Sequence, residues 1–366
     1  MRHLIQRYNN CISVFFEKTQ RDLILSTWLI YSIGFFLFLN AGNAFCKDSR
    51  EDWDKISGPI PIVNLSPIQL LFLHATPDRA ETLPKDRHSL RFNVAITNTL
   101  LWGKSEDYYG YIDIEMIRSS LELKYGILSK VELGISLPII YSYPGFMDHS
   151  IFEFENFFND TRSLRKKEDQ HKSANNFTYL VKKNNMTFIA GKKRSSGIGD
   201  LILRVKEKIW NEGDRLPCLS IRLAVKIPTG DEDKAFGSGK VDYGVGLLLQ
   251  KNIKRVTAYL NADVIFPGDA FDQQNISLSN FYGIMLGAEY KVSSRFSTLT
   301  QLNYITRPFE NTGIEMLDRR MWNLLLGINY LTECRVFIQG GAIEDIIGSS
   351  NAGSDITFFL NVGKTF

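Results

Sequence analysis

The chain has 366 residues, of which 44% are hydrophobic and 23% charged, and its formal net charge at pH 7 is +3. The mean hydropathy of −0.12 is too low for a bundle of transmembrane helices, but it suits a membrane β-barrel, in which only alternate strand residues face lipid. The small net charge, without a basic helix, argues against a nucleic-acid-binding protein. Four cysteines in no metal-ligand spacing argue against a disulfide scaffold or a metal site, and no cofactor is expected.

The N-terminus has the pattern of a secretory leader. An apolar run from Leu23 to Leu39 follows basic residues, and Gly42 and Ala44 are small residues at the −3 and −1 positions of a cleavage site. The sequence predicts a signal peptide over residues 1–44. An uncleaved membrane anchor or lipid attachment at Cys46 are the alternatives.

Residues 45–86 precede the first predicted strand and contain the run GPIPIVNLSPIQLLFL at 58–73. The prolines of this run prevent a regular helix or a central strand. We expect the segment on the periplasmic side, either as a plug that threads the barrel lumen or as a tail packed under the barrel.

Twelve segments alternate apolar and polar residues, which is typical of strands with one apolar face. They cover 90–97, 117–125, 131–137, 201–206, 219–227, 241–249, 256–264, 284–290, 296–304, 322–330, 335–343 and 356–366. Short turns alternate with longer loops, the longest at 143–199, as in outer-membrane barrels. The sequence therefore predicts an all-β fold over residues 87–366: a closed antiparallel transmembrane β-barrel of about 12 strands in the bacterial outer membrane.

In this register one face of each strand is apolar and the other carries charge. An outward Lys or Arg at the bilayer midplane costs ~2–4 kcal/mol, so the charged side chains are expected to point inward. The predicted lumen-lining residues are Arg91, Arg118, Glu122, Lys124, Arg204, Lys206, Arg222, Lys226 and Asp263.

The long outer loop 143–199 contains two features. Between Gly145 and Asp160, apolar residues at helical spacing predict a short amphipathic helix. The following stretch, 161–195, is basic, which indicates either contact with lipopolysaccharide phosphates or a solvated loop. The candidate lipid-phosphate contacts are Arg162, Arg165, Lys166, Lys167, Lys192, Lys193 and Arg194.

A lipid-modifying enzyme is the least favoured function. Asp148, His149 and Ser150 are adjacent in sequence, which does not make a triad, and no GxSxG elbow is present. No catalytic residue is predicted and the chain is not expected to be an enzyme. We expect a narrow or gated channel for small solutes, and the alternative is a non-conducting structural or lipopolysaccharide-contacting barrel.

The last predicted strand ends in Phe366, after alternating apolar residues at 358, 360 and 362. This resembles the C-terminal signal that the barrel-assembly machinery reads, so that machinery and outer-membrane lipid are the expected partners. The oligomeric state is not predicted.

Several motifs, in their order along the chain, resemble domain-of-unknown-function family 3187. They are the proline-containing run at 58–73, Gly145–Asp148, GIGD at 197–200, KIPTGD at 226–231 and GSGKVDYG at 237–244. The resemblance covers roughly 58–366. It implies a bacterial outer-membrane barrel and supplies no catalytic residues.

Overall fold

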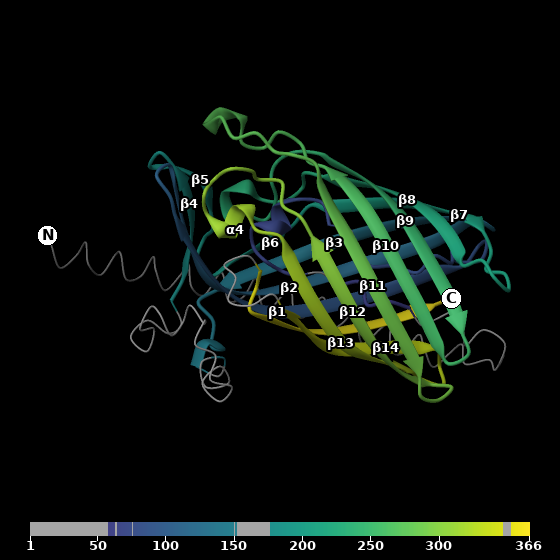
Figure 1. Cartoon of the computed structure of the whole chain (residues 1–366). Helices are drawn as coiled ribbons and strands as arrows, with labels where there is room; N and C mark the ends of the chain where they lie inside the picture. The colour runs from purple at the N-terminus through teal and green to yellow at the C-terminus, as the bar shows by residue number, and fades with distance from the viewer. Residues whose placement is uncertain (1–57, 63, 75, 150, 152–175, 347–352) are drawn as a thin grey trace, which may run out of the picture. The chain divides into compact units, whose positions relative to one another are not determined.

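The computed structural model describes residues 58–346 and 353–366, apart from residues 63, 75, 150 and 152–175 (Figure 1). The predicted signal peptide and the beginning of the N-terminal segment lie outside the described residues. So do four of the predicted lipid-phosphate contacts, Arg162, Arg165, Lys166 and Lys167.

The described strands form one antiparallel sheet of fifteen strands, twelve of which close into a ring. The ring runs β1, β2, β3 and then β7 to β15 in order, and β15 pairs back onto β1. The predicted closed barrel of twelve strands is confirmed. The ring strands are β1 (His88–Lys104), β2 (Tyr108–Leu128), β3 (Val131–Tyr143), β7 (Leu201–Trp210), β8 (Cys218–Ile227), β9 (Asp242–Ile253), β10 (Val256–Phe266), β11 (Phe281–Lys291), β12 (Phe296–Ile305), β13 (Met321–Leu331), β14 (Val336–Asp345) and β15 (Ile356–Thr365).

The other three strands lie between β3 and β7, in the outer loop 143–199, where the sequence predicted a short helix and a basic stretch but no strand. β4 (Thr178–Lys183) pairs with the beginning of β2, and β5 (Met186–Ala190) pairs with β4. β6 (Ser195–Ile198) pairs with the end of β3. The sequence did not predict these three strands, because strands of four to six residues are too short to show a clear period of two.

Helices are few and short among the described residues. Asp148, His149 and Ile151 are helical, and the rest of the predicted amphipathic helix lies outside the described residues. The short helix α4 (Glu315–Asp318) lies in the connection between β12 and β13. No helix in the described ranges is long and apolar enough to cross a membrane.

The two ends of the barrel differ. At one end, called the short-turn end, tight connections join the strands, and the N–H of Phe366 donates to the carbonyl of His88 at 2.8 Å. At the other end, called the long-loop end, the connections are longer and contain the 3-10 turns η4 (Glu232–Lys234) and η5 (Asp272–Gln274) as well as α4. The first and last ring strands therefore begin and finish at the same end.

The outer surface of the ring is apolar. On β8, Leu223 is 52% exposed while its neighbour Arg222 is 3% exposed, and on β13, Leu326 is 55% exposed while Leu325 is fully buried. The same alternation runs along β9 to β11. This is the reverse of a soluble barrel, whose charged residues would lie outside.

Exposed aromatic side chains form two rows around this apolar surface. The row at the long-loop end contains Tyr243, Phe266 and Tyr282, and the row at the short-turn end contains Tyr125, Trp210, Tyr290 and Tyr330. On β11, Tyr282 and Tyr290 are eight residues apart, or about 27 Å along the strand. An apolar band between two aromatic rows is characteristic of the lipid-facing surface of membrane barrels.

Candidate functional site: the inner segment and the barrel wall

Residues 58–86, called the inner segment below, lie inside the ring (Figure 1). Its apolar side chains are almost completely buried, including Ile60, Leu65 and Leu73 at 0–1% exposure. Its main chain and side chains bond to wall residues on strands all around the ring, from β3 and β7 through β8, β9, β10 and β12. Only the interior of a closed ring gives one segment access to all these strands.

The inner segment rises through the lumen and returns. It begins at Gly58 near β14 and reaches the long-loop end at Asn64, whose Oδ1 accepts hydrogen bonds from the N–H and the hydroxyl of Ser354. After the 3-10 turn η2 (Gln69–Leu71) it descends to the short-turn end. There the N–H of Leu83 donates to Glu132 Oε2 at 2.8 Å, and β1 begins.

The wall binds the main chain of the inner segment through side-chain amides. Gln301 Oε1 accepts from the N–H of Ile60 at 2.6 Å, and its Nε2 donates to the carbonyl of the same residue at 3.3 Å. Asn261 makes the equivalent pair of bonds with the main chain of Asp78, at 2.8 and 2.9 Å. Buried backbone groups need partners, and the five prolines of residues 58–84 reduce the number of N–H donors that must be paired.

A group of charged side chains, called the central cluster, surrounds Asp78. Its members are Asp78 and the wall residues Arg91, Glu122, Lys124, Glu132, Arg204, Lys206, Arg222 and Asp263. The Asp78 carboxylate lies 2.8 Å from Lys124 Nζ and 3.0 Å from Lys206 Nζ. Lys206 also lies 3.0 Å from Glu132, so the inner segment joins an ion network that the wall already contains.

Two arginines of the central cluster bind the inner segment just before Asp78. Arg222 Nη1 donates to the carbonyl of Thr76 at 2.6 Å while its Nη2 lies 2.7 Å from Asp263 Oδ1. Arg204 Nη2 donates to the hydroxyl of Thr76 at 2.8 Å. A planar guanidinium can donate to a carboxylate and to a second oxygen of the inner segment at the same time. This explains why arginine and not lysine stands at these positions.

A second group, the upper cluster, holds the tip of the inner segment at the long-loop end. Lys226 Nζ lies 2.8 Å from Asp200 Oδ2 and 3.1 Å from Asp242 Oδ2, and all three side chains are at most 4% exposed. Lys226 Nζ also donates to the carbonyl of Leu71 at 2.6 Å. Asp242 Oδ2 accepts from the N–H of Leu73 at 2.7 Å.

The upper cluster explains the glycine-rich motifs. GIGD supplies Asp200, KIPTGD supplies Lys226, and GSGKVDYG supplies Asp242. A Cβ at Gly237 would lie 2.4 Å from the Asp200 carboxylate, and a Cβ at Gly230 would lie 2.9 Å from it. Glycine is therefore required at both positions for the loop to approach the buried carboxylate.

We expect Gly237→Val to weaken the upper cluster. The added side chain must displace Asp200 from Lys226, and overpacking of this kind costs about 1–3 kcal/mol. The variant should unfold at a lower urea concentration and show faster proteolysis of the inner segment. Gly213→Val is the matched control, because a Cβ at Gly213 meets no atom within 4 Å; equal behaviour of the two variants would contradict the prediction.

The opposite wall of the lumen is almost neutral. The inward residues of the middle of β12 to β15 are amides, hydroxyls and apolar side chains, such as Gln301, Asn329, Gln339 and Asn361. On neighbouring β11, Glu289 is fully buried and accepts hydrogen bonds from Tyr259, Ser297 and Asn329. The lumen thus has a charged side and an amide side.

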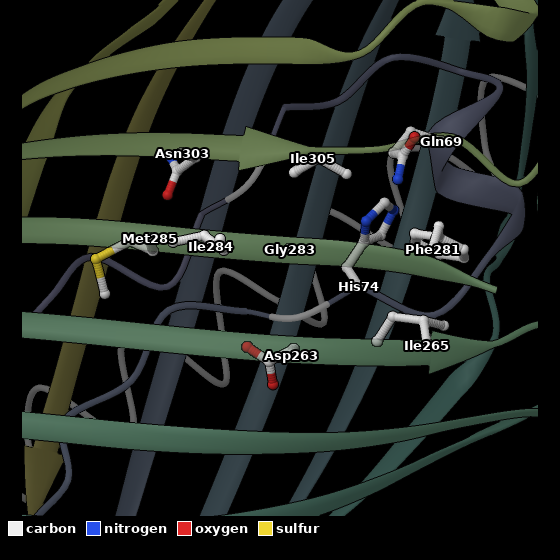
Figure 2. Close-up of a pocket in the computed structure, with 10 residues that line it drawn as sticks. All are labelled: Gln69, His74, Asp263, Ile265, Phe281, Gly283, Ile284, Met285, Asn303 and Ile305. Atoms are coloured by element: carbon white, nitrogen blue, oxygen red, sulfur yellow. The ribbon is translucent and has the colours of Figure 1, made fainter.

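The space between the inner segment and strands β10 to β12 is small. Figure 2 shows Gln69 and His74 of the inner segment facing residues of β10, β11 and β12 around a cavity of 20 Å³. Its polar lining includes Asp263 and Asn303. A cavity of this volume has room for about one water molecule, so a solute does not fit there.

A larger pocket of 310 Å³ lies at the long-loop end, between the loops after β8 and β10 and strand β5. Leu71 at the tip of the inner segment contributes to its lining, together with Phe188 and Phe271, whose rings lie 5.3 Å apart. Ser238 also lines the pocket and accepts a hydrogen bond from Lys226 Nζ at 2.7 Å. This pocket therefore reaches the upper cluster.

The structure brings most of the predicted lumen-lining residues together. Seven of them are in the central cluster and Lys226 is in the upper cluster, while Arg118 lies on the same face of β2 as Glu122 and Lys124. Their role in transport stays a prediction. The sequence analysis missed Asp78, Glu132, Asp200, Asp242 and Asn261, although two of these belong to motifs that it singled out.

The other candidates lie elsewhere. Lys192, Lys193 and Arg194 are exposed before β6, and Lys192 Nζ lies 3.8 Å from Asp233. His149 is exposed, whereas Asp148 is buried and accepts a hydrogen bond from Asn98; Ser150 lies outside the described residues. The described residues contain no cluster of His, Cys, Asp and Glu suited to a metal ion.

The closed ring, its apolar outside and its polar inside define a β-barrel of the outer-membrane type. The family model of domain-of-unknown-function family 3187, described as a protein of unknown function, matches residues 48–366, so the chain belongs to this family. The resemblance inferred from the motifs is thereby confirmed.

Solved structures with a similar fold are outer-membrane barrels. The COG4313 outer membrane channel from Pseudomonas putida F1 is 14% identical with a TM-score of 0.52, over 80% of this chain and 100% of that chain. The transport unit of the autotransporter AIDA-I from Escherichia coli is 12% identical with a TM-score of 0.42, over 82% and 95%. The toluene transporter TodX from P. putida is 10% identical with a TM-score of 0.36, over 78% and 91%. No curated protein matches the chain. The likeness to the COG4313 channel, at 14% identity, concerns the fold alone.

Proposed function

We propose that this protein is an outer-membrane channel for small solutes that its own inner segment holds closed. The observation that carries the proposal is a polar lumen filled by a segment that is not part of the wall. A structural barrel needs no buried cations such as Lys206 and Lys226, because apolar residues of similar volume often stabilise an interior at least as well. A channel needs a polar interior for its solute.

The outward surface supports the proposed location. Apolar side chains between two aromatic rows match a bilayer, with the short-turn end in the periplasm and the long-loop end outside the cell. The strand β15 pairs with both β14 and β1, so it closes the ring, and Phe366, which follows it, is the proposed signal for the barrel-assembly machinery.

The inner segment suits a movable plug better than a permanent filling. Hydrogen bonds, ion pairs and apolar contacts, such as those of Phe72 with Phe281 and Phe309, hold it in the lumen, and its covalent connection to the ring is through residue 87. The described residues of the inner segment contain no strand, so they can leave the lumen without breaking a ladder of the barrel. The pocket at the long-loop end would admit a solute as far as Leu71.

Planar-bilayer recordings test the proposal. The mature chain should give few and brief conductance steps, whereas a variant that lacks residues 58–83 should give long-lived steps, because the deletion clears the lumen. Heat-modifiable migration on a gel would verify that the variant forms a barrel. A folded deletion variant without conductance would overturn the channel proposal.

A second candidate is a barrel that contacts lipopolysaccharide. The observation that favours it is the run Lys192, Lys193 and Arg194, which is exposed at the long-loop end. Replacing the three residues by glutamine should weaken binding to lipopolysaccharide vesicles and leave the conductance unchanged. Unchanged vesicle binding would remove this candidate.

A further inference from the structure

The Asp78 carboxylate lies between two ammonium groups of the barrel wall, and its Oδ1 also accepts a hydrogen bond from the N–H of Arg79 in the inner segment. Lys124 and Lys206 provide the two ammonium groups, at 2.8 and 3.0 Å from one carboxylate oxygen. Asn261, which is 2% exposed, binds only the main chain of the same residue. Lys206 Nζ also donates to the carbonyl of Arg79 at 3.2 Å, so the two lysines bind the carboxylate while Asn261 and Lys206 bind the backbone beside it.

The wall around this site has an excess of positive charge. Five cationic side chains of the central cluster lie on the wall, against three wall carboxylates. The cations are Arg91, Lys124, Arg204, Lys206 and Arg222, and the carboxylates are Glu122, Glu132 and Asp263. Asp78 supplies a fourth carboxylate from the inner segment. When the inner segment leaves, the wall of the central cluster keeps two uncompensated positive charges.

We propose that the pair Lys124 and Lys206 is a binding site for the carboxylate of a transported solute, and that Asp78 occupies it as a substitute in the closed channel. The inference rests on the proposed function and adds a substrate class, small organic carboxylates. The amide side of the lumen faces this site and suits the uncharged part of such a solute.

The geometry of the lysine pair also suits a site that a solute carboxylate can leave again. Glu132 lies 3.0 Å from Lys206 and 3.6 Å from Lys124, so it partly compensates both lysines after Asp78 has left. A solute carboxylate then competes with Glu132 for the same ammonium groups. Conduction requires a site that attracts the solute and also releases it, and this competition provides the release.

The test uses the chain without residues 58–83, in planar bilayers under a gradient of KCl, with benzoate as the probe. We expect a reversal potential that indicates anion selectivity and a concentration-dependent reduction of the chloride current by benzoate. Benzylamine, of similar size and opposite charge, should not reduce the current.

Lys124→Gln with Lys206→Gln should abolish the anion selectivity and raise the benzoate concentration for half-block by roughly tenfold, as expected when charge-assisted hydrogen bonds are lost. Lys251→Gln is the control, because Lys251 lies on the outward face of β9, away from the lumen, where it pairs with Glu212. A conducting channel that selects cations, or whose block by benzoate survives the double substitution, would overturn the inference. An absence of conductance would instead contradict the proposed function, so the two failures can be told apart.

In the full-length chain, Asp78→Asn offers an independent readout. The neutral amide should increase the frequency of open events and should let benzoate act on them, because the site is no longer filled by a carboxylate. An unchanged opening frequency would show that Asp78 does not hold the site, and would also count against the inference.

Discussion

Replacing Lys226 by methionine is expected to open the proposed channel and to destabilise the barrel at its long-loop end. The change leaves Asp200 and Asp242 buried without the cation that lies within 3.1 Å of both. It also leaves the carbonyl of Leu71 without its donor. Removing one partner of a buried ion pair costs about 3–5 kcal/mol, more than any other single change considered for this protein.

The measurement is the open probability in planar bilayers together with the midpoint of urea unfolding. Lys234→Met is the control: Lys234 pairs with Asp231 in the same loop at 2.8 Å, but both side chains are about a third exposed, and such pairs contribute about 0–1 kcal/mol. If the two variants open equally often, the upper cluster does not hold the inner segment.

A disulfide between the inner segment and the wall should hold the channel in its closed state until the disulfide is reduced. The positions are Ile60→Cys and Gly327→Cys, because a Cβ at Gly327 would lie 2.4 Å from Ile60 Cδ1. After the isoleucine side chain is shortened, the two Cβ atoms come near the separation of about 3.5–4.5 Å that a disulfide needs. The pair is placed in a chain that carries Asp78→Asn, so that openings are frequent before oxidation.

Oxidation should abolish these openings, and a reductant should restore them. Each single-cysteine variant provides a control, since the described residues already include the cysteines Cys218 and Cys334, which could react on their own. Openings that persist in the oxidised double-cysteine chain would mean that ions pass without displacement of the inner segment.

The ring strands could be predicted because the alternation of apolar and polar residues along each strand can be recognised in the sequence alone. Each strand needs an apolar residue at every second position, so Leu223 and Leu326 identify the outward face without knowledge of their neighbours in space. The strands β4 to β6 follow a different requirement. At the long-loop end, β4 pairs with the beginning of β2, β5 pairs with β4, and β6 pairs with the end of β3, so their short pairings depend on how far β2 and β3 reach beyond the ring.

The candidate site was only half predictable. The cations Lys124, Lys206 and Lys226 follow from the register of their strands, because a charge must avoid lipid. Their partners do not. Asp78 lies in a proline-containing segment without periodicity, and Asp200 borders a turn, so neither has a face that the sequence can assign. That GIGD, KIPTGD and GSGKVDYG meet at one lysine becomes visible only when strands β7 to β9 are placed side by side.

The division of the lumen into a charged side and an amide side has a directional effect. Opposed walls of such different polarity create an electric field across the width of the pore as well as along its axis. A molecule with a single carboxylate would be oriented as it enters, with its carboxylate along β2 and β7 and its uncharged part along β12 to β14. Length would then matter less than the position of the charge, and a solute charged at both tips would find no favourable orientation.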